Sequence, residues 1–275
     1  MQDAADPKNA IAANRAKAGV RLVYGPGRPV SRLADLAEWG GYRVKFPAAA
    51  EHAEAVLINT GGGMAGGDEL RVSVALEAGA ALTFTTQSAE RVYRSGGANA
   101  SVAVDLKVGE GGDLAFIPQE TILFSHARLA RTIAAGVADN GTLLLAETIV
   151  FGRAASGERV LDGFLQDRWR IRRAGRLVYA DDVRFAGPMT SLLQRAAVGA
   201  GAGAAGCILL VSPNAPDRLE DARRLLDGNR CRTAASTWNG LLSVRALGDP
   251  AEVRGIVAAV IAGLSRRPLP RVWSV

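Results

Sequence analysis

Alternating apolar and polar positions recur over most of this chain. In residues 71–77, for example, Val72, Val74 and Leu76 are separated by more polar residues, which is the period-two pattern of a half-buried strand. Short segments of this kind, bounded by glycine or proline, follow one another along the chain. The pattern predicts a β body over residues 19–190, preceded by a loose tail at residues 1–18.

Three segments of this body resemble one another, namely residues 71–87, 101–119 and 131–148. Each has an alternating strand, a turn that contains glycine, and a second strand, and Val72 and Val102 are 30 positions apart. Repetition at this period predicts stacked hairpins with a continuous core, as in solenoid-like β proteins. Three hairpins of a sandwich would give the same pattern.

The local composition changes after residue 190, where alanine and glycine dominate. A small α/β end-piece is predicted over residues 205–265, with a proline at the head of each helix, where proline is well tolerated. Its predicted elements are, in order, a strand over 207–211, a helix over 216–226, a strand over 241–245 and a helix over 250–264.

Composition narrows the class of protein. The 275 residues carry a formal net charge of +6 and have no uncharged apolar run long enough to cross a membrane. No signal peptide is visible, and Cys207 and Cys231 are the two cysteines, which is compatible with a reducing compartment. We therefore expect a cytoplasmic chain of one domain over residues 19–275. The patterns assign no role to these cysteines or to His52 and His126.

A glycine-rich stretch over residues 59–70 is the most unusual local feature. Gly61, Gly63 and Gly66 follow an apolar strand and match G-x-G-x-x-G, the fingerprint of a dinucleotide phosphate loop. That site needs a helix to begin at the loop, because the helix N-terminus binds the phosphate. The strand pattern at 71–77 follows instead, so we interpret the stretch as a close-packed turn.

Familiar catalytic and metal signatures are missing from the sequence. It contains no G-x-S-x-G, H-E-x-x-H, C-x-x-C or Walker lysine. An arginine-rich segment over residues 168–176 has no alternating base-stacking aromatics. We interpret that segment as a solvated strand face, and we expect no nucleic-acid partner and no membrane partner.

Four acidic residues stand where they need a partner. Asp68 ends the glycine turn, Glu120 follows Pro118-Gln119, and Glu147 and Asp181 interrupt apolar strands. A buried acid is costly unless it is paired or hydrated. Either these acids pair with the abundant arginines, or they line a hydrated passage in which oxygen ligands hold a divalent ion in transit.

Four segments together resemble the UreD (also called UreH) family of urease accessory proteins. They are NTGGGMAGGD at 59–68, TTQSAERVYRS at 85–95, PQETILFSHARL at 118–129 and GRAASGE at 152–158, and residues 242–249 and 270–273 also fit. The motif residues are Gly61, Gly62, Gly63, Gly66, Gly67, Asp68, Tyr93, Arg94, Ser95, Pro118, Gln119, Glu120, Gly152, Arg153, Gly157 and Glu158. The family usually has Asp-Gly where Ser125-His126 stands, and Ser, Thr or Pro where Glu90 stands.

The resemblance implies a mainly β fold, an irregular two-layer, helix-like stack of strands with helices near the C-terminus. It also implies a non-enzymatic nickel-insertion chaperone that binds apo-urease and UreF and, through UreF, the GTPase UreG. On this interpretation Asp68, Glu120, Glu147 and Asp181 line a transient nickel route, and no cofactor is bound stably.

Two other hypotheses come from different classes. A β-structured hydrolase would use a Glu/Asp pair facing across an open cleft. A metal-storage protein is disfavoured, because the chain lacks the dense nitrogen and sulfur ligands that hold nickel tightly.

Overall fold

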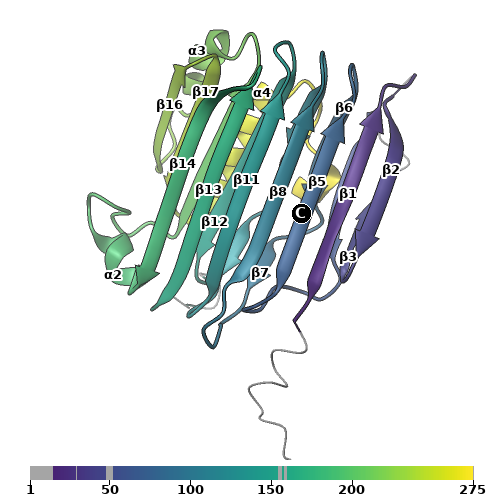
Figure 1. Ribbon diagram of the computed structural model, residues 1–275. Helices are drawn as coiled ribbons and strands as arrows, with labels where there is room; N and C mark the ends of the chain where they lie inside the picture. Colours follow the sequence, from purple (N-terminus) through teal and green to yellow (C-terminus); the bar gives the residue numbers. More distant parts are fainter. Residues whose placement is uncertain (1–14, 29, 48–51, 154–156, 158–159, 275) are drawn as a thin grey trace, which may run out of the picture.

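Two β-sheets lie face to face and form the body of the molecule (Figure 1). The computed structural model describes residues 15–28, 30–47, 52–153, 157 and 160–274. Within these residues, sheet A has seven strands in the order β14-β13-β11-β8-β5-β1-β2. Their bounds are β1 (Lys17–Gly25), β2 (Arg32–Trp39), β5 (Glu69–Leu76), β8 (Ala100–Val108), β11 (Arg128–Val137), β13 (Gly163–Arg173) and β14 (Arg176–Gly187).

Sheet B forms the second layer. Its main path in the described residues runs β16-β17-β15-β12-β9-β6-β4-β3, and two short strands, β7 and β10, pair beside it. The bounds are β3 (Tyr42–Lys45), β4 (Glu54–Asn59), β6 (Ala81–Thr86), β7 (Glu90–Val92), β9 (Asp113–Phe116), β10 (Thr121–Leu123), β12 (Thr142–Phe151), β15 (Ala204–Val211), β16 (Arg232–Trp238) and β17 (Leu241–Gly248).

Successive coils of the chain stack in parallel through both layers. Glu69 in sheet A pairs with Ser101, and Ala81 in sheet B pairs with Asp113, so the same offset separates the coils in both layers. The predicted two-layer, helix-like stack with helices near the C-terminus is therefore confirmed.

The structure corrects the prediction of hairpins. The two strands of each repeat, such as β5 and β6, lie in different sheets and pair with the equivalent strands of neighbouring coils. Each glycine turn is thus an arch between the layers. The physical reason is burial: Val74 on β5 and Phe84 on β6 both face one shared interior, and the Phe84 ring stacks on Phe116 of the next coil at 5.1 Å.

The C-terminal elements extend sheet B and cover its outer face. β15 and β17 pair antiparallel with the sheet, and α4 (Pro250–Leu264) packs against β12, β15 and β17, behind sheet B in Figure 1. Asp249 caps α4 by accepting hydrogen bonds from the Ala251 and Glu252 amides. The end-piece therefore shares its sheet with the β body.

Several element boundaries differ from the predicted ones. The helix predicted at 216–226 consists of a 3₁₀ turn, η2 (Pro216–Arg218), and α3 (Leu219–Leu225). The sequence patterns missed β16 and α2 (Met189–Gln194), and another 3₁₀ turn, η3 (Arg271–Trp273), closes the chain. β1 begins at Lys17, inside the predicted tail, of which residues 1–14 lie outside the described part.

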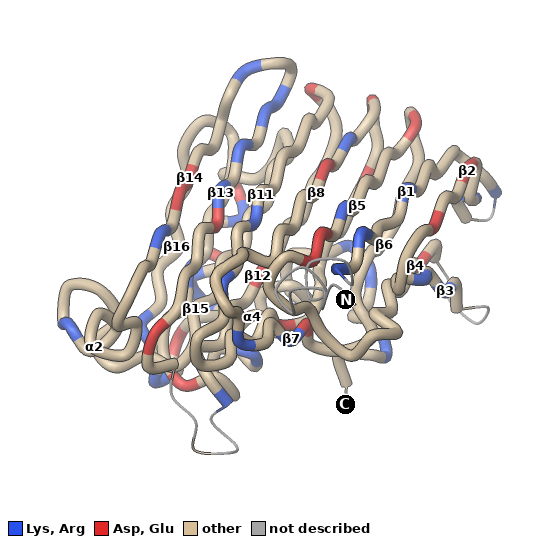
Figure 2. The backbone as a smooth tube through the Cα atoms, turned by 60° about the horizontal axis from the view of Figure 1, so that its bottom comes forward, with Lys and Arg blue, Asp and Glu red and all other residues tan. Residues whose placement is uncertain are grey.

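Basic and acidic positions are interspersed along the strands (Figure 2). On the arginine-rich face of β13, Arg168 forms an ion pair with Asp182 at 2.8 Å and Arg170 donates to the Asp181 carbonyl at 2.8 Å. Both arginines are thus bound by acceptors on the neighbouring strand, β14. In the described residues, no helix is both long and apolar enough to cross a membrane.

Candidate functional site

A buried cluster of one arginine and two carboxylates lies between the sheets. Arg131 on β11 donates two hydrogen bonds to Asp167, at 2.9 and 2.7 Å, and its Nη1 also contacts Glu147 on β12. Their exposed fractions are 3% for Arg131, 6% for Asp167 and 6% for Glu147. Arg131 and Asp167 are register partners on adjacent parallel strands, so the fold brings them together although 36 residues separate them in sequence.

The cluster perturbs the titration of Glu147. Burial and the negative charge of Asp167 raise the pKa of this carboxyl to about 7, against the opposing attraction of Arg131. One guanidinium therefore faces two carboxylates, and Glu147 is the carboxylate that gains a proton near neutral pH.

Cavities lie on both sides of this cluster. Arg131 and Glu147 line a cavity of about 60 Å³ and also a cavity of about 320 Å³. We call these the inner and the outer cavity. Arg131 and Glu147 line both spaces, so the contact between these two side chains lies where the cavities are neighbours.

Asp181 on β14 lines the outer cavity together with Arg245 and Cys207. Arg245 forms an ion pair with Asp181 at 2.6 Å, and Tyr179 donates to the same carboxylate oxygen at 3.0 Å. The Cys207 sulfur lies 3.8 Å from the Tyr179 hydroxyl, and burial raises the pKa of the Cys207 thiol to about 11. Cys207 is thus a protonated thiol at neutral pH, and a metal ion that binds it would have to displace the proton.

Glu90 on β7 also lines the inner cavity. It also borders a pocket of about 40 Å³ whose lining includes Gly62 and Gln87. Tyr42 and Asn59 donate to the Glu90 carboxylate at 2.9 and 2.8 Å. Burial raises the pKa of Glu90, and these two hydrogen bonds oppose the rise. Neighbouring spaces thus share a lining carboxylate, Glu147 for the inner and outer cavities and Glu90 for the inner cavity and this pocket.

Asp68 has a different environment. One carboxylate oxygen accepts a hydrogen bond from the Ala16 amide at 3.0 Å, and the other accepts from the Ala65 amide at 2.7 Å. Asp68 therefore closes the glycine turn and holds the chain that leads into β1. It does not border the three spaces above.

Glu120 lies against α4. It forms an ion pair with Arg254 at 2.5 Å, and the same guanidinium sits over the Trp273 ring at 5.1 Å. Gln119 donates to the Val272 carbonyl at 2.8 Å. This part of the third motif thus fastens the C-terminal segment to sheet B, and Glu120 also lies outside the lining of the three spaces.

Motif segments far apart in the sequence lie side by side at one end of the coils. The Met64 amide donates to the Arg91 carbonyl and the Tyr93 amide donates to the Met64 carbonyl, at 2.7 and 2.8 Å. The Tyr93 ring meets the Phe124 ring edge-on at 5.1 Å, and Arg153 lies over Phe124 at 4.6 Å. One stack of loops therefore contains parts of all four motifs, although Glu158 lies outside the described residues.

Sequence reasoning missed several members of this site, among them Arg131, Asp167, Glu90 and Arg245. A signal for Asp167 was present, because it shares the apolar face of its strand with Trp169 and Ile171. The described residues contain no group of three or more His, Cys, Asp or Glu that would hold a metal ion. The fold and its interior thus define a β-solenoid protein whose buried carboxylates are paired with arginines.

Comparison with known proteins identifies the family. A family model described as UreD urease accessory protein matches residues 16–274. Urease accessory protein UreD 1 of Methylobacterium radiotolerans is 50% identical over 270 residues, which cover 96% of this chain and 94% of that protein. Urease accessory protein UreD of Xanthobacter autotrophicus is 43% identical over 278 residues, covering 99% and 96%. The chain belongs to the UreD family of urease accessory proteins, so the resemblance seen in the motifs is confirmed.

Proposed function

We propose that this chain acts in the cytoplasm as a non-catalytic maturation factor for urease. It binds apo-urease and UreF, reaches the GTPase UreG through UreF, and lets Ni²⁺ pass through its interior to the urease active site. The observation that carries the proposal is the row of neighbouring spaces that share Glu90 and the Arg131–Glu147 contact as lining, in a member of a urease accessory family. Relatives named as accessory proteins also point to a non-catalytic role.

The proposed route uses part of the predicted acid set. Glu147 and Asp181 line the outer cavity, and we add Asp167 and Glu90. Asp68 and Glu120 make the structural contacts described above, so we place them beside the route rather than on it.

The ligand chemistry suits transit rather than storage. Carboxylate oxygens bind Ni²⁺ less tightly than nitrogen and sulfur donors do, and Arg131 and Arg245 compete with a cation for the same carboxylates. A divalent ion would therefore bind weakly at each position and leave again.

A hydrolase would need an open pair of carboxylates. The pair that the fold brings together, Glu147 and Asp167, is buried and bound by one guanidinium. We therefore prefer the maturation factor.

The scaffold role is tested by co-purification of the chain with its cognate UreF and with apo-urease. Retention of both is the expected result. Failure to retain either protein would contradict the scaffold role.

The route is tested separately by measuring nickel per urease after activation in cells. Asp181→Ala is expected to lower nickel content several-fold while the complexes stay intact. Asp182→Ala is the matched control, because Asp182 is the next residue on β14 and lies on the exposed face. Equal nickel content with the two variants would refute the route and leave the scaffold role standing.

A further inference from the structure

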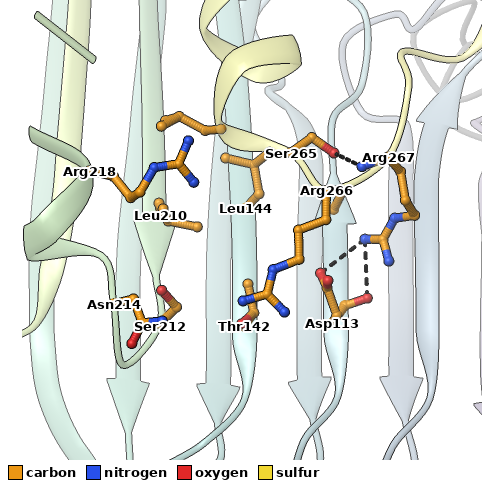
Figure 3. Close-up of a pocket in the computed structure, with 12 residues that line it drawn as sticks. Asp113, Thr142, Leu144, Leu210, Ser212, Asn214, Arg218, Ser265, Arg266 and Arg267 are labelled. Carbon is orange, nitrogen blue, oxygen red and sulfur yellow. Dashed lines mark hydrogen bonds and ion pairs between the residues drawn. The ribbon is translucent and has the colours of Figure 1, made fainter. Parts of the chain in front are cut away.

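A separate polar cavity of about 90 Å³ lies on the outer face of sheet B (Figure 3). Strands β9, β12 and β15 form its floor, and η2 and the segment after α4 form its walls. Ala115, Leu144 and Leu210 on these strands belong to the apolar cluster under α4. Residues two positions along a strand share a face, so Thr142 and Ser212 also lie on the outer side, away from the interior spaces.

Three arginines border this cavity, and two of them are already neutralised. Arg267 forms an ion pair with Asp113 at 3.0 Å, and Arg218 pairs with Asp221 at 2.9 Å and donates to the Gly263 carbonyl at 2.7 Å. Both guanidinium groups are thereby fixed at the rim of the cavity.

Arg266 is the third arginine. Figure 3 shows its side chain reaching from the segment after α4 down toward Thr142. Within the described part of the chain, the Arg266 side chain has neither an ion pair nor a hydrogen bond. The cavity therefore contains one positive charge that no described carboxylate offsets.

Hydrogen-bond donors in the cavity also exceed the acceptors that the protein offers them. Ser212 is 5% exposed, Thr142 is partly buried and Asn214 is exposed, and their side chains form no hydrogen bond with any described residue. The Ser265 hydroxyl accepts from the Arg267 amide at 3.0 Å, so its own proton remains to be donated. An oxyanion in the cavity would accept hydrogen bonds from this set of donors and from the Arg266 guanidinium.

We propose that this cavity binds a small tetrahedral oxyanion, of which phosphate is the type. Arg266 supplies the charge, the Ser212 and Thr142 hydroxyls and the Asn214 amide supply hydrogen bonds, and Arg218 and Arg267, each paired with a carboxylate, form the rim. The cavity volume of about 90 Å³ leaves room for a phosphate group among these side chains. The site is independent of the nickel route, since it lies on the other face of sheet B.

The test is a titration of the full chain with inorganic phosphate. Isothermal calorimetry and the unfolding temperature are its two readouts. Sodium chloride at matched ionic strength is the salt control. Saturable binding is expected, with the dissociation constant raised at least tenfold by Arg266→Ala and to a smaller extent by Ser212→Ala. The control variant is Arg71→Ala, which removes an exposed arginine from sheet A and is expected to leave phosphate binding unchanged.

The outcomes separate cleanly. Phosphate also stabilises proteins generally, because it is excluded from their surfaces. A non-saturating rise in unfolding temperature that is equal in the wild type and in Arg266→Ala would overturn the proposal. Competition by adenosine monophosphate that is lost in Arg266→Ala would support the site and assign the bound group to a larger phosphate monoester. None of these results depends on urease activation.

Discussion

Arg131 and Glu147 face each other across the interior from opposite sheets, one on β11 and the other on β12. The same guanidinium binds Asp167 on the adjacent strand of sheet A. When both carboxylates are ionised, the cluster carries a net negative charge inside the protein. Because of that imbalance, we expect the cluster to be sensitive to substitution and to pH.

Arg131→Met is expected to destabilise the fold strongly, because it leaves two buried carboxylates without their cation. Removal of one partner from a buried ion pair typically costs about 3–5 kcal/mol. Urea unfolding followed by circular dichroism measures the change. Arg21→Ala is the control, since Arg21 pairs with Asp35 on the exposed face of sheet A and such pairs contribute about 0–1 kcal/mol. Similar losses in the two variants would mean that the cluster is not stabilising.

The pH dependence of stability is expected to carry the signature of Glu147. The pKa of Glu147 is raised in the folded state to about 7, from its ordinary value of 4.5. The folded state thus binds more protons than the unfolded state between these values. The stabilisation that comes from the raised pKa of Glu147 is fully present below pH 4.5 and is lost as the pH rises through 7.

Glu147→Gln should remove this part of the slope. A single group changes the free energy of unfolding by at most ~1.4 kcal/mol per pH unit, and urea unfolding between pH 5 and 8 measures it. Glu220→Gln, on the exposed surface of α3, serves as the control. A slope that is unchanged by Glu147→Gln would contradict the assignment.

Gly66→Ala is expected to cost about 1–3 kcal/mol, as overpacking usually does. A Cβ at Gly66 would lie 1.9 Å from the Ser95 hydroxyl oxygen and 2.5 Å from the Ala98 carbonyl oxygen. At Gly96, in the same stack of loops, a Cβ would meet nothing within 4 Å, so Gly96→Ala is the control. The difference in unfolding temperature between the two variants measures the close packing of the glycine turn. If the two temperatures agree, the turn has room to relax.

Asp68→Ala should loosen the start of β1. It removes the acceptors of the Ala16 and Ala65 amides, and hydrogen bonds to a charged group contribute about 1.5–3 kcal/mol. Amide hydrogen exchange is expected to accelerate at Ala16 and along the first residues of β1. Glu69→Ala is the control, because Glu69 makes an exposed ion pair with Lys17 at 3.8 Å. Equal exchange in the two variants would rule out this anchoring role.

The sequence contains the coil repeat but not the way its strands pair. Alternation in 71–77 predicts a strand with one buried face, and a turn with glycine predicts a change of direction. A hairpin and an arch share both features, because strand period is the same in either. A hairpin forms when a strand pairs with the next strand of its own coil, and an arch forms when it pairs with a strand of the neighbouring coil. This pairing is set by the whole stack and not by the local sequence.

The same limit applies to the candidate site. Acids inside apolar strands are visible in the sequence, and three of the four predicted ones, Glu120, Glu147 and Asp181, pair with arginines. Their partners are set by the register between strands and by the packing of the two sheets. Local backbone conformation is easier to predict from the sequence. His126 stands where the family usually has glycine, and it has a φ of 63°, in the region that glycine favours.

The placement of α4 has a consequence for synthesis of the chain. β12 ends at Phe151, but α4, which covers its outer face, begins only at Pro250. At about 5–20 residues per second, that interval lasts roughly 5–20 s, during which the apolar outer face of β12 lacks its helix. Ribosome-bound chains stalled before Pro250 should therefore sediment as aggregates more readily than chains stalled after Leu264. The speed of the ribosome, rather than the stability of the finished fold, sets how long this face is open to other chains.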